Sequence, residues 1–341
     1  MRARRLATVL VALACCEAAL AQVTITEGTD INIDVAADGR IAMDLIGGIW
    51  VVPQKGGNAA PIEAGLLPAE RPRWSPDGSA LVFEARSEQR SGLYLYDFAS
   101  NEVRELGEGR YSDRQPDWHP DGERLVFASQ RHDTGFDLWE LDVPTGLTWR
   151  ITTLPGDEAE PAWSADGRNL VYIHHHEDRW SLVLRRFGAP DRVLVNAEER
   201  LSAPSWRPDG SLVTFARESA DGVTMNMVIL SDPLLERVLI QEQELDLAPV
   251  AWFDRQQMLY TADGRIRKRP NGRSTSSNTT INSASGSSTG RIFSASATTS
   301  PERFMNVCGW STPTSNTCPP SAVTGPRPKH PPHSYGTPEM P

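Results

Sequence analysis

Three short patterns in this 341-residue chain contain residue types that can do chemistry. The run His174–His176 contains a His-x-His pair of the kind that can begin a metal site, and it follows an apolar run that predicts a strand. The segment Gly286–Gly290 matches the G-x-S-x-G pattern of a serine nucleophile. The run Asp157–Glu160 holds three carboxylates, which could serve as an acid and a base. Whether these residues can do chemistry, or match the patterns by chance, depends on the secondary-structure elements that position them.

Those elements repeat with a fixed period. A strand that ends in Pro-x-Trp is followed by a turn of the Ser-Pro-Asp-Gly type and by a second apolar strand. In such a turn Pro presets φ, Asp bonds the backbone and Gly takes the positive φ. Five Trp residues mark the copies at intervals of 43 to 46 residues: Trp74, Trp118, Trp163, Trp206 and Trp252. A period in the 40s with alternating short strands is typical of propeller blades.

Each repeat contains four short strands, which predicts one antiparallel blade. A degenerate unit before Trp74 keeps the turn at Asp38 and Gly39 and has Val35 where the other units have Trp. The region 22–269 therefore predicts an all-β propeller of about six four-stranded blades, the last of them incomplete. We expect the Trp rings to fill the core between blades, because burying one is worth roughly 4–6 kcal/mol as an upper bound.

The sequence context of each chemical pattern argues against a catalytic role. His174–His176 aligns with Ala85–Ser87 of another unit, so it is the end of a blade strand, and a catalytic metal site would need further ligands. Gly286–Gly290 lies in a Ser/Thr tract without the strand-to-helix turn that the nucleophile requires. We interpret Asp157–Glu160 as a solvated acidic loop. We assign no catalytic residue, metal ligand or cofactor, and we do not expect this chain to be an enzyme by itself.

The first 21 residues have the pattern of a secretory signal peptide. Basic residues precede the apolar run Leu6–Leu13, and Ala19-Leu20-Ala21 forms an A-x-A cleavage site. Lipidation at Cys15 or Cys16 is the less favoured alternative, because the residues before them fit a lipobox poorly. No later segment is apolar enough to predict a transmembrane span. The pattern predicts a periplasmic or secreted protein.

The segment 270–341 differs in composition from the repeats. Residues 271–300 contain 16 Ser or Thr, Pro is frequent after Pro301, and Asp is absent from the whole segment. This composition predicts a disordered tail. Two interpretations remain open: a natural polar tail, or an out-of-frame translation that begins just after Arg269.

Charge argues against a nucleic-acid partner. The chain has a formal net charge of −10, and the region 22–269 holds 26 basic against 41 acidic side chains. Such a surface repels phosphate unless it contains a basic stripe, and we identify none. The oligomeric state cannot be predicted from these features.

The units Trp-Ser-Pro-Asp-Gly, Leu-Val-Phe and Leu-Tyr-Leu-Tyr-Asp resemble the PD40 repeats of TolB-like propellers, from about Thr24 to Arg269. TolB itself carries an α/β domain before the propeller, whereas here the repeats begin almost at once. The opening segment, Glu27 to Pro53, is more similar to the start of secreted bacterial amidohydrolases. Those enzymes place such a propeller ahead of a metal-dependent TIM barrel, so this resemblance implies a front portion without the catalytic domain.

The resemblance also implies that the segment before each Trp is the innermost strand and borders a central channel. Polar residues there become candidates for binding a protein or peptide partner: Arg71, Arg73, Gln115, Asp117 and Glu160. The alternative is that these charges only hydrate the channel. The sequence thus predicts a non-catalytic binding propeller, with a truncated amidohydrolase propeller as the alternative.

The signal pattern makes a direct prediction about the exported protein. Cleavage after Ala21 should leave Gln22 as the first residue of the mature chain. Intact-mass measurement or N-terminal sequencing of the exported protein checks this. A diacylglycerol-modified Cys15 or Cys16 would contradict it.

Overall fold

The structure, a computed structural model, describes residues 23–24, 31–63, 65, 68–86, 90–132, 134–242, 244–270, 279–280 and 296–297. The predicted signal peptide, 1–21, lies outside the described residues, and so does nearly all of the segment 270–341. The described part contains strands and no helix. Two short strands, β1 (Val23–Thr24) and β26 (Ser296–Ala297), pair with each other.

Six four-stranded antiparallel sheets contain the other strands, each built from consecutive strands and here called blades 1 to 6. Blade 1 has β2 (Ile33–Val35), β3 (Ile41–Leu45), β4 (Gly48–Val52) and β5 (Ala60–Pro61); blade 2 has β6 (Ala69–Trp74), β7 (Ala80–Arg86), β8 (Ser91–Asp97) and β9 (Glu102–Leu106). Blade 3 has β10 (Asp113–Trp118), β11 (Arg124–Ser129), β12 (Asp137–Asp142) and β13 (Thr148–Arg150); blade 4 has β14 (Asp157–Trp163), β15 (Asn169–His176), β16 (Arg179–Arg186) and β17 (Arg192–Ala197). Blade 5 has β18 (Arg200–Trp206), β19 (Leu212–Ser219), β20 (Gly222–Ile229) and β21 (Leu235–Ile240); blade 6 has β22 (Ala251–Trp252), β23 (Gln257–Ala262), β24 (Arg265–Pro270) and β25 (Thr279–Thr280).

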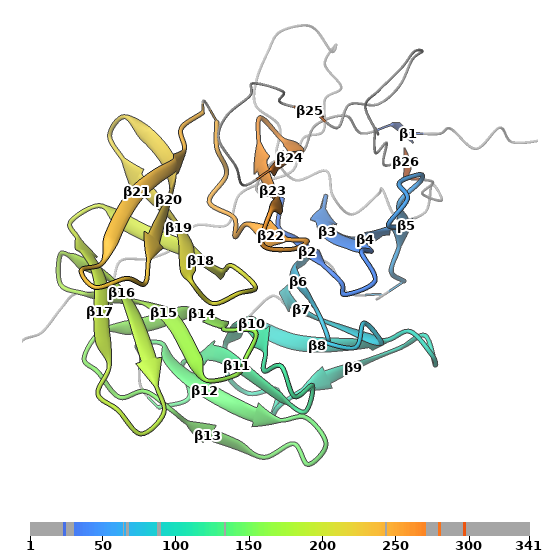
Figure 1. The fold of residues 1–341 in the computed structure, drawn as a ribbon. Coiled ribbons are helices and arrows are strands. Elements are labelled where there is room, and N and C mark those ends of the chain that lie inside the picture. Colours follow the sequence, from blue (N-terminus) through green and yellow to red (C-terminus); the bar gives the residue numbers. More distant parts are fainter. Residues whose placement is uncertain are drawn as a thin grey trace, which may run out of the picture. The chain divides into compact units, whose positions relative to one another are not determined.

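The blades follow one another around a centre, with their first strands innermost (Figure 1). The predicted six-bladed all-β propeller is therefore confirmed. Blade 6 differs in detail from the expected incomplete blade, because it has four strands but its first and last contain two residues each. Its last strand lies inside the segment that composition assigned to the tail.

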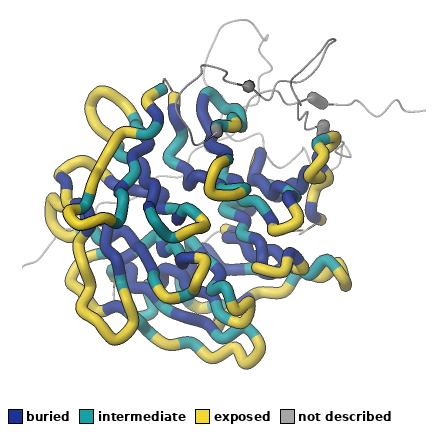
Figure 2. The backbone as a smooth tube through the Cα atoms, viewed as in Figure 1, coloured by how far each residue is buried: buried dark blue, intermediate teal, exposed yellow. Residues whose placement is uncertain are grey.

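One apolar cluster lies at each boundary between neighbouring blades. The cluster of blades 4 and 5, for example, packs Val171, Ile173 and Leu182 against Trp206 and Phe215. Burial is concentrated on the inner strands, and exposed residues lie on turns and outer edges (Figure 2). Every blade thus buries both faces against its two neighbours.

The ring is closed by packing between blade 6 and blade 1. Leu259 and Ala251 belong to the same apolar cluster as Ile33, Met43 and Trp50. In the described residues no strand of blade 1 is hydrogen-bonded to a strand of blade 6. Side-chain packing therefore holds this boundary.

The repeated Trp residues lie at equivalent buried positions, as the repeat predicted. Trp74, Trp118, Trp163 and Trp206 are 5–7% exposed. The Trp118 indole N–H donates to the Arg73 carbonyl at 3.2 Å, and that of Trp206 donates to the Ala162 carbonyl at 3.0 Å. Each of these two bonds links a Trp to the residue just before the Trp of the preceding blade.

Trp163→Ala should destabilise the propeller by about 3–5 kcal/mol, because it leaves a cavity between blades 3 and 4. Urea unfolding measures the change in the free energy of unfolding. Trp149→Ala is the matched control, because Trp149 is 40% exposed on the outer strand β13 and should cost much less. Equal losses in the two variants would contradict the assignment of Trp163 to the core.

Candidate binding site in the central channel

A β-bulge occurs at the same place in the first strand of blades 2 to 5. The residue at the bulge has a positive φ, although none of the four is glycine: Arg71 (56°), Gln115 (56°), Glu160 (52°) and Ala203 (55°). A left-handed non-glycine residue costs about 1–2 kcal/mol, and such strain is common at functional sites. Each of these residues is followed by a proline: Pro72, Pro116, Pro161 and Pro204.

The preceding blade supplies a side-chain acceptor for the backbone N–H of each bulge residue. Asp44 accepts from Arg71 at 2.8 Å, and Glu84 accepts from Gln115 at 3.3 Å. The Gln115 side chain then accepts from Glu160 at 3.1 Å, and the Glu160 carboxylate accepts from Ala203. Gln115 and Glu160 therefore act both as bulge residues and as acceptors for the next blade.

A second set of polar side chains lies two residues further along the first strands. Asp34 accepts the backbone N–H of Trp74 at 2.7 Å, and Asp117 accepts that of Trp163 at 2.7 Å. Arg73 lies between the two carboxylates, 3.9 Å from each. Two carboxylates thus share one guanidinium.

Burial changes the proton affinity of these carboxyl groups. It raises the pKa of Asp117 to about 7, against the opposing effect of Arg73 and with a further increase from Asp34. It also raises the pKa of Asp44 to about 6 and raises that of Glu84. These three carboxyls therefore hold protons at higher pH than carboxyls in water do.

A cavity of about 20 Å³ lies among these residues, enough for roughly one water molecule. Its lining consists of Arg71, Arg73, Gln115, Pro116, Glu160, Pro161, Pro204 and Pro249. Four of the five predicted site residues thus border one cavity, and the fifth, Asp117, adjoins it through Arg73. Within the described residues the Arg71 guanidinium makes no hydrogen bond or close ion pair, so it is available to a ligand.

Sequence reasoning missed the carboxylates that support the bulges. Asp44 and Glu84 lie on the second strands of blades 1 and 2, where blades 3 and 4 have Ala128 and Ile173. A charged residue at an otherwise apolar repeat position was the available signal. The Arg114 guanidinium, on the same first strand as Gln115, lies 3.4 Å from the centre of the Phe136 ring.

The His-x-His pair is the end of a strand, as the repeat alignment indicated. His174 bonds the Pro155 carbonyl at 2.9 Å, and His175 stacks on Trp180 with ring centres 4.0 Å apart. No group of three or more His, Cys, Asp or Glu side chains within metal-binding reach occurs in the described part of the chain. The G-x-S-x-G segment lies outside the described residues.

The interpretation of Asp157–Glu160 as a solvated loop was wrong. These residues belong to the inner strand β14, and Glu158 is fully buried. Its carboxylate accepts the Leu154 N–H at 2.8 Å, and burial, with a smaller effect of Asp137, raises its pKa to about 8. The strand pairs by its backbone, so a local run of charge did not exclude it from the sheet.

Comparisons with known proteins agree with this architecture. The family model of the TolB beta propeller domain, PD40, matches residues 63–265. A putative TolB from Agrobacterium tumefaciens is similar with a TM-score of 0.58 and 19% identity, over 67% of this chain and 86% of the other. TolB from Acinetobacter baumannii gives 0.54 and 19%, over 66% of this chain and 57% of the other.

Kuenenia stuttgartiensis hydrazine synthase has a TM-score of 0.55 and 15% identity, over 72% of this chain and 78% of the other. Structural likeness at such identities shows the fold alone. No curated protein sequence matches the chain. In the part of the chain that the structure describes, no helix has the length and apolar character needed to cross a membrane.

Asp117→Asn should remove a pH dependence of stability. Because the folded pKa of Asp117 is about 7 and the ordinary value is 3.8, the folded state holds this proton more tightly than the unfolded chain does. The free energy of unfolding therefore falls as pH rises from about 4 to about 7. Wild type should lose up to about 4 kcal/mol relative to the variant across this range.

Urea titrations of both proteins across this pH range measure the effect. Asp77→Asn is the control that should not change the slope of the profile in this range, because hydrogen bonds from Ser75 and Ser79 lower the pKa of Asp77 below its ordinary value of 3.8. The contribution of Asp77 to stability is lost as pH falls, not as it rises. Parallel pH profiles for wild type and D117N would contradict the raised pKa.

Proposed function

Because the chain belongs to the TolB β-propeller domain family, PD40, we propose that it is a periplasmic, non-catalytic propeller that binds a protein or peptide partner at its central channel. The proposed site consists of Arg71, Arg73, Gln115, Asp117 and Glu160. The supporting observation is the repeated bulge, which presents strained, polar residues to one cavity from blades 2, 3 and 4.

Arg71 is the residue of this site that is best placed to contact a partner directly. The carboxylates of Asp44, Glu84 and Glu160 already accept backbone N–H groups. They would therefore act on a partner through their negative charge more than through direct hydrogen bonds. The Arg71 guanidinium can still donate to a carboxylate or a carbonyl of a partner. A segment that presents polar groups of both signs would fit this arrangement.

The size of the cavity supports binding at the mouth of the channel over passage through it. A volume of about 20 Å³ holds roughly one water molecule and is too small for the side chain of a partner. A partner would therefore meet the bulge residues from the channel opening, and the prolines would form the floor. Export to the periplasm rests on the signal pattern of residues 1–21.

The opening segment supports a second proposal. The likeness of Glu27 to Pro53 to secreted amidohydrolases suggests a propeller that supports, or screens access to, a metal-dependent hydrolase domain. Reading the DNA downstream of the Arg269 codon in all three frames tests this proposal. A frame that continues the blades and then encodes a His-x-His barrel would favour it over the free-standing binding propeller.

Site-specific photocrosslinking tests the channel site. A benzoylphenylalanine at Arg71 should crosslink a partner protein in the native host, because this side chain lines the cavity without an internal partner. The matched control carries the same residue at Arg104, which is exposed on the outer strand β9. Crosslinked species that are identical for the two positions, or absent for Arg71, would contradict binding at the channel.

A further inference from the structure

A second candidate site lies at one end of blade 4, on the side of the sheet where β14 turns into β15. We propose that this groove binds an acidic peptide segment of a partner protein, one that carries an apolar or aromatic side chain beside its carboxylates. The groove, called here the blade-4 groove, is lined by Asp166, Gly167, Arg168, Asn169, Arg186 and Phe187. Because none of these residues borders the channel cavity, the inference does not rest on the function proposed above.

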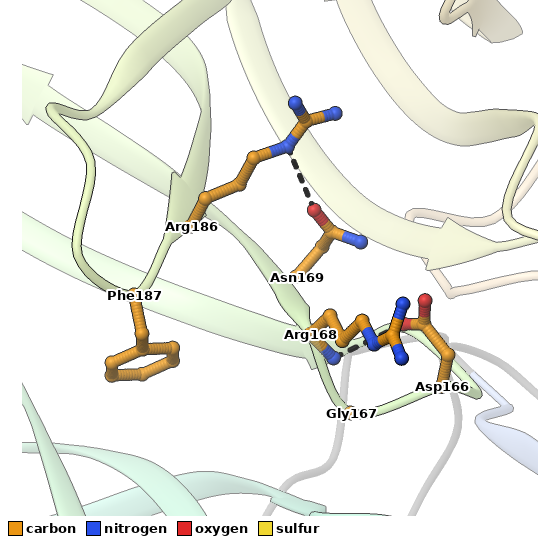
Figure 3. A pocket seen from close by; sticks show the side chains of 6 residues that line it. All are labelled: Asp166, Gly167, Arg168, Asn169, Arg186 and Phe187. Carbon is orange, nitrogen blue, oxygen red and sulfur yellow. Dashed lines mark hydrogen bonds between the residues drawn. The ribbon is translucent and has the colours of Figure 1, made fainter.

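The blade-4 groove has the size of a ligand site. Its volume is about 620 Å³, within the range of about 300–1,000 Å³ that is usual for binding clefts. Arg168 comes from the turn between β14 and β15, whereas Arg186 and Phe187 come from the end of β16 (Figure 3). The Arg186 side chain extends toward Asn169, and the Phe187 ring extends in a different direction (Figure 3). A ligand that contacts both Arg186 and Phe187 must cross the end of β16.

Phe187 provides an exposed aromatic surface on a rigid base. Its ring is 52% exposed and stacks on the buried Trp163, with ring centres 5.4 Å apart and planes at 15°. Phe98 stacks on Trp74 in the same way in blade 2, but the Arg40 guanidinium covers both rings there. On Phe187 the one guanidinium near the ring, within the described residues, is that of Arg185 at 5.9 Å, so the face away from Trp163 remains open to a partner.

The two arginines of the groove form no close ion pair within the described residues, although the Arg168 charge acts at longer range on Asp166. Arg186 donates through Nε to the Asn169 side chain at 2.9 Å. Asp166 is the one acid of the groove, and its carboxylate accepts Ser164 Oγ at 2.6 Å and the Arg168 N–H at 3.0 Å. The groove therefore carries an excess of positive charge in a chain whose net charge is −10.

Blades 2 and 3 have an acid at the position that Arg186 occupies in blade 4. The residue that pairs with the start of the second strand is Asp97 in blade 2 and Asp142 in blade 3, but it is Arg186 in blade 4. Asp97 accepts backbone N–H groups of its turn at 2.8 Å, and Asp142 accepts the Thr145 N–H at 2.9 Å. Blade 4 thus has a base where these two blades have a structural acid, and blade 5 has the apolar Ile229 there.

The combination of two guanidinium groups without a close ion pair, an amide and an open aromatic ring fits carboxylates beside an apolar side chain. Arginine binds carboxylates in two-pronged geometry, and Arg and aromatic residues are enriched among the residues that dominate protein interfaces.

Peptide binding to the full-length chain tests the inference. The probe is a fluorescein-labelled peptide of sequence Glu-Glu-Phe-Glu-Glu, and its control is Gln-Gln-Phe-Gln-Gln. Fluorescence anisotropy at low ionic strength should show binding of the acidic peptide and little of the control. The variant R168E/R186D should weaken binding at least about tenfold, because it removes both charge-assisted donors.

This variant is chosen so that the fold survives. Glu123 and Asp142 stand at the same two positions in blade 3, so the substitutions give blade 4 the residues of a neighbouring blade. Its melting temperature should therefore match that of wild type. The matched control is R104E/R237E, which changes the net charge equally on the exposed outer strands β9 and β21 and should bind as wild type does. Phe187→Ala should weaken binding several-fold, because it removes the aromatic wall.

Several outcomes would overturn the inference. These are no measurable binding of the acidic peptide, equal binding of the glutamine peptide, or equal losses in R168E/R186D and R104E/R237E. Displacement of the peptide by inorganic phosphate at equal concentration would show a general anion site in place of a peptide site. Self-association of the chain that R168E/R186D abolishes would assign the groove to a second copy.

Discussion

The structure depends on apolar packing between the faces of neighbouring blades. A four-stranded antiparallel sheet with two apolar faces cannot remain in water, and here each sheet buries one face against the blade before it and one against the blade after it. One Trp per repeat occupies this boundary in blades 2 to 5. The same packing closes the ring between blades 6 and 1, where no strand pairing contributes in the described residues.

The polar residues of the channel follow from the geometry that this packing imposes. Inner strands that converge on one axis bulge at the same residue in four blades, and each bulge leaves a backbone N–H that needs an acceptor. Side chains of the preceding blade supply these acceptors, so Asp44, Glu84, Gln115 and Glu160 stabilise the ring before they can serve a ligand. Burial in this position also explains the raised pKa values of Asp44 and Asp117. Arg71 differs from these residues because its guanidinium makes no hydrogen bond or close ion pair within the described residues, although its charge acts at longer range on Glu84.

Repetition provides an internal control for function. When several blades share one local structure, a residue that differs from its counterparts is a better indicator of function than its side-chain type alone. Arg186 stands where blades 2 and 3 have a turn-capping acid, and Glu158, like Asp113 of blade 3, places a carboxyl in a buried position of a first strand. The first residue, Arg186, exposes charge beside the open Phe187 ring. The second, Glu158, is accommodated by a hydrogen bond from the Leu154 N–H and by a raised pKa. Only the first leaves donors and an apolar surface available to another molecule.

The sequence by itself determined the number of blades, the burial of the Trp residues and the turns, because these follow from local spacing that recurs every 43 to 46 residues. It also identified Arg71, Arg73, Gln115, Asp117 and Glu160 as neighbours, once the repeat was placed around an axis. Tertiary structure decided which of them is free. Hydrogen bonds from one blade to the next engage Asp117, Gln115 and Glu160, and these bonds join residues about 45 positions apart that no local pattern relates. The blade-4 groove was hidden for the same reason, since its walls come from a turn and a strand end that meet only in the folded sheet.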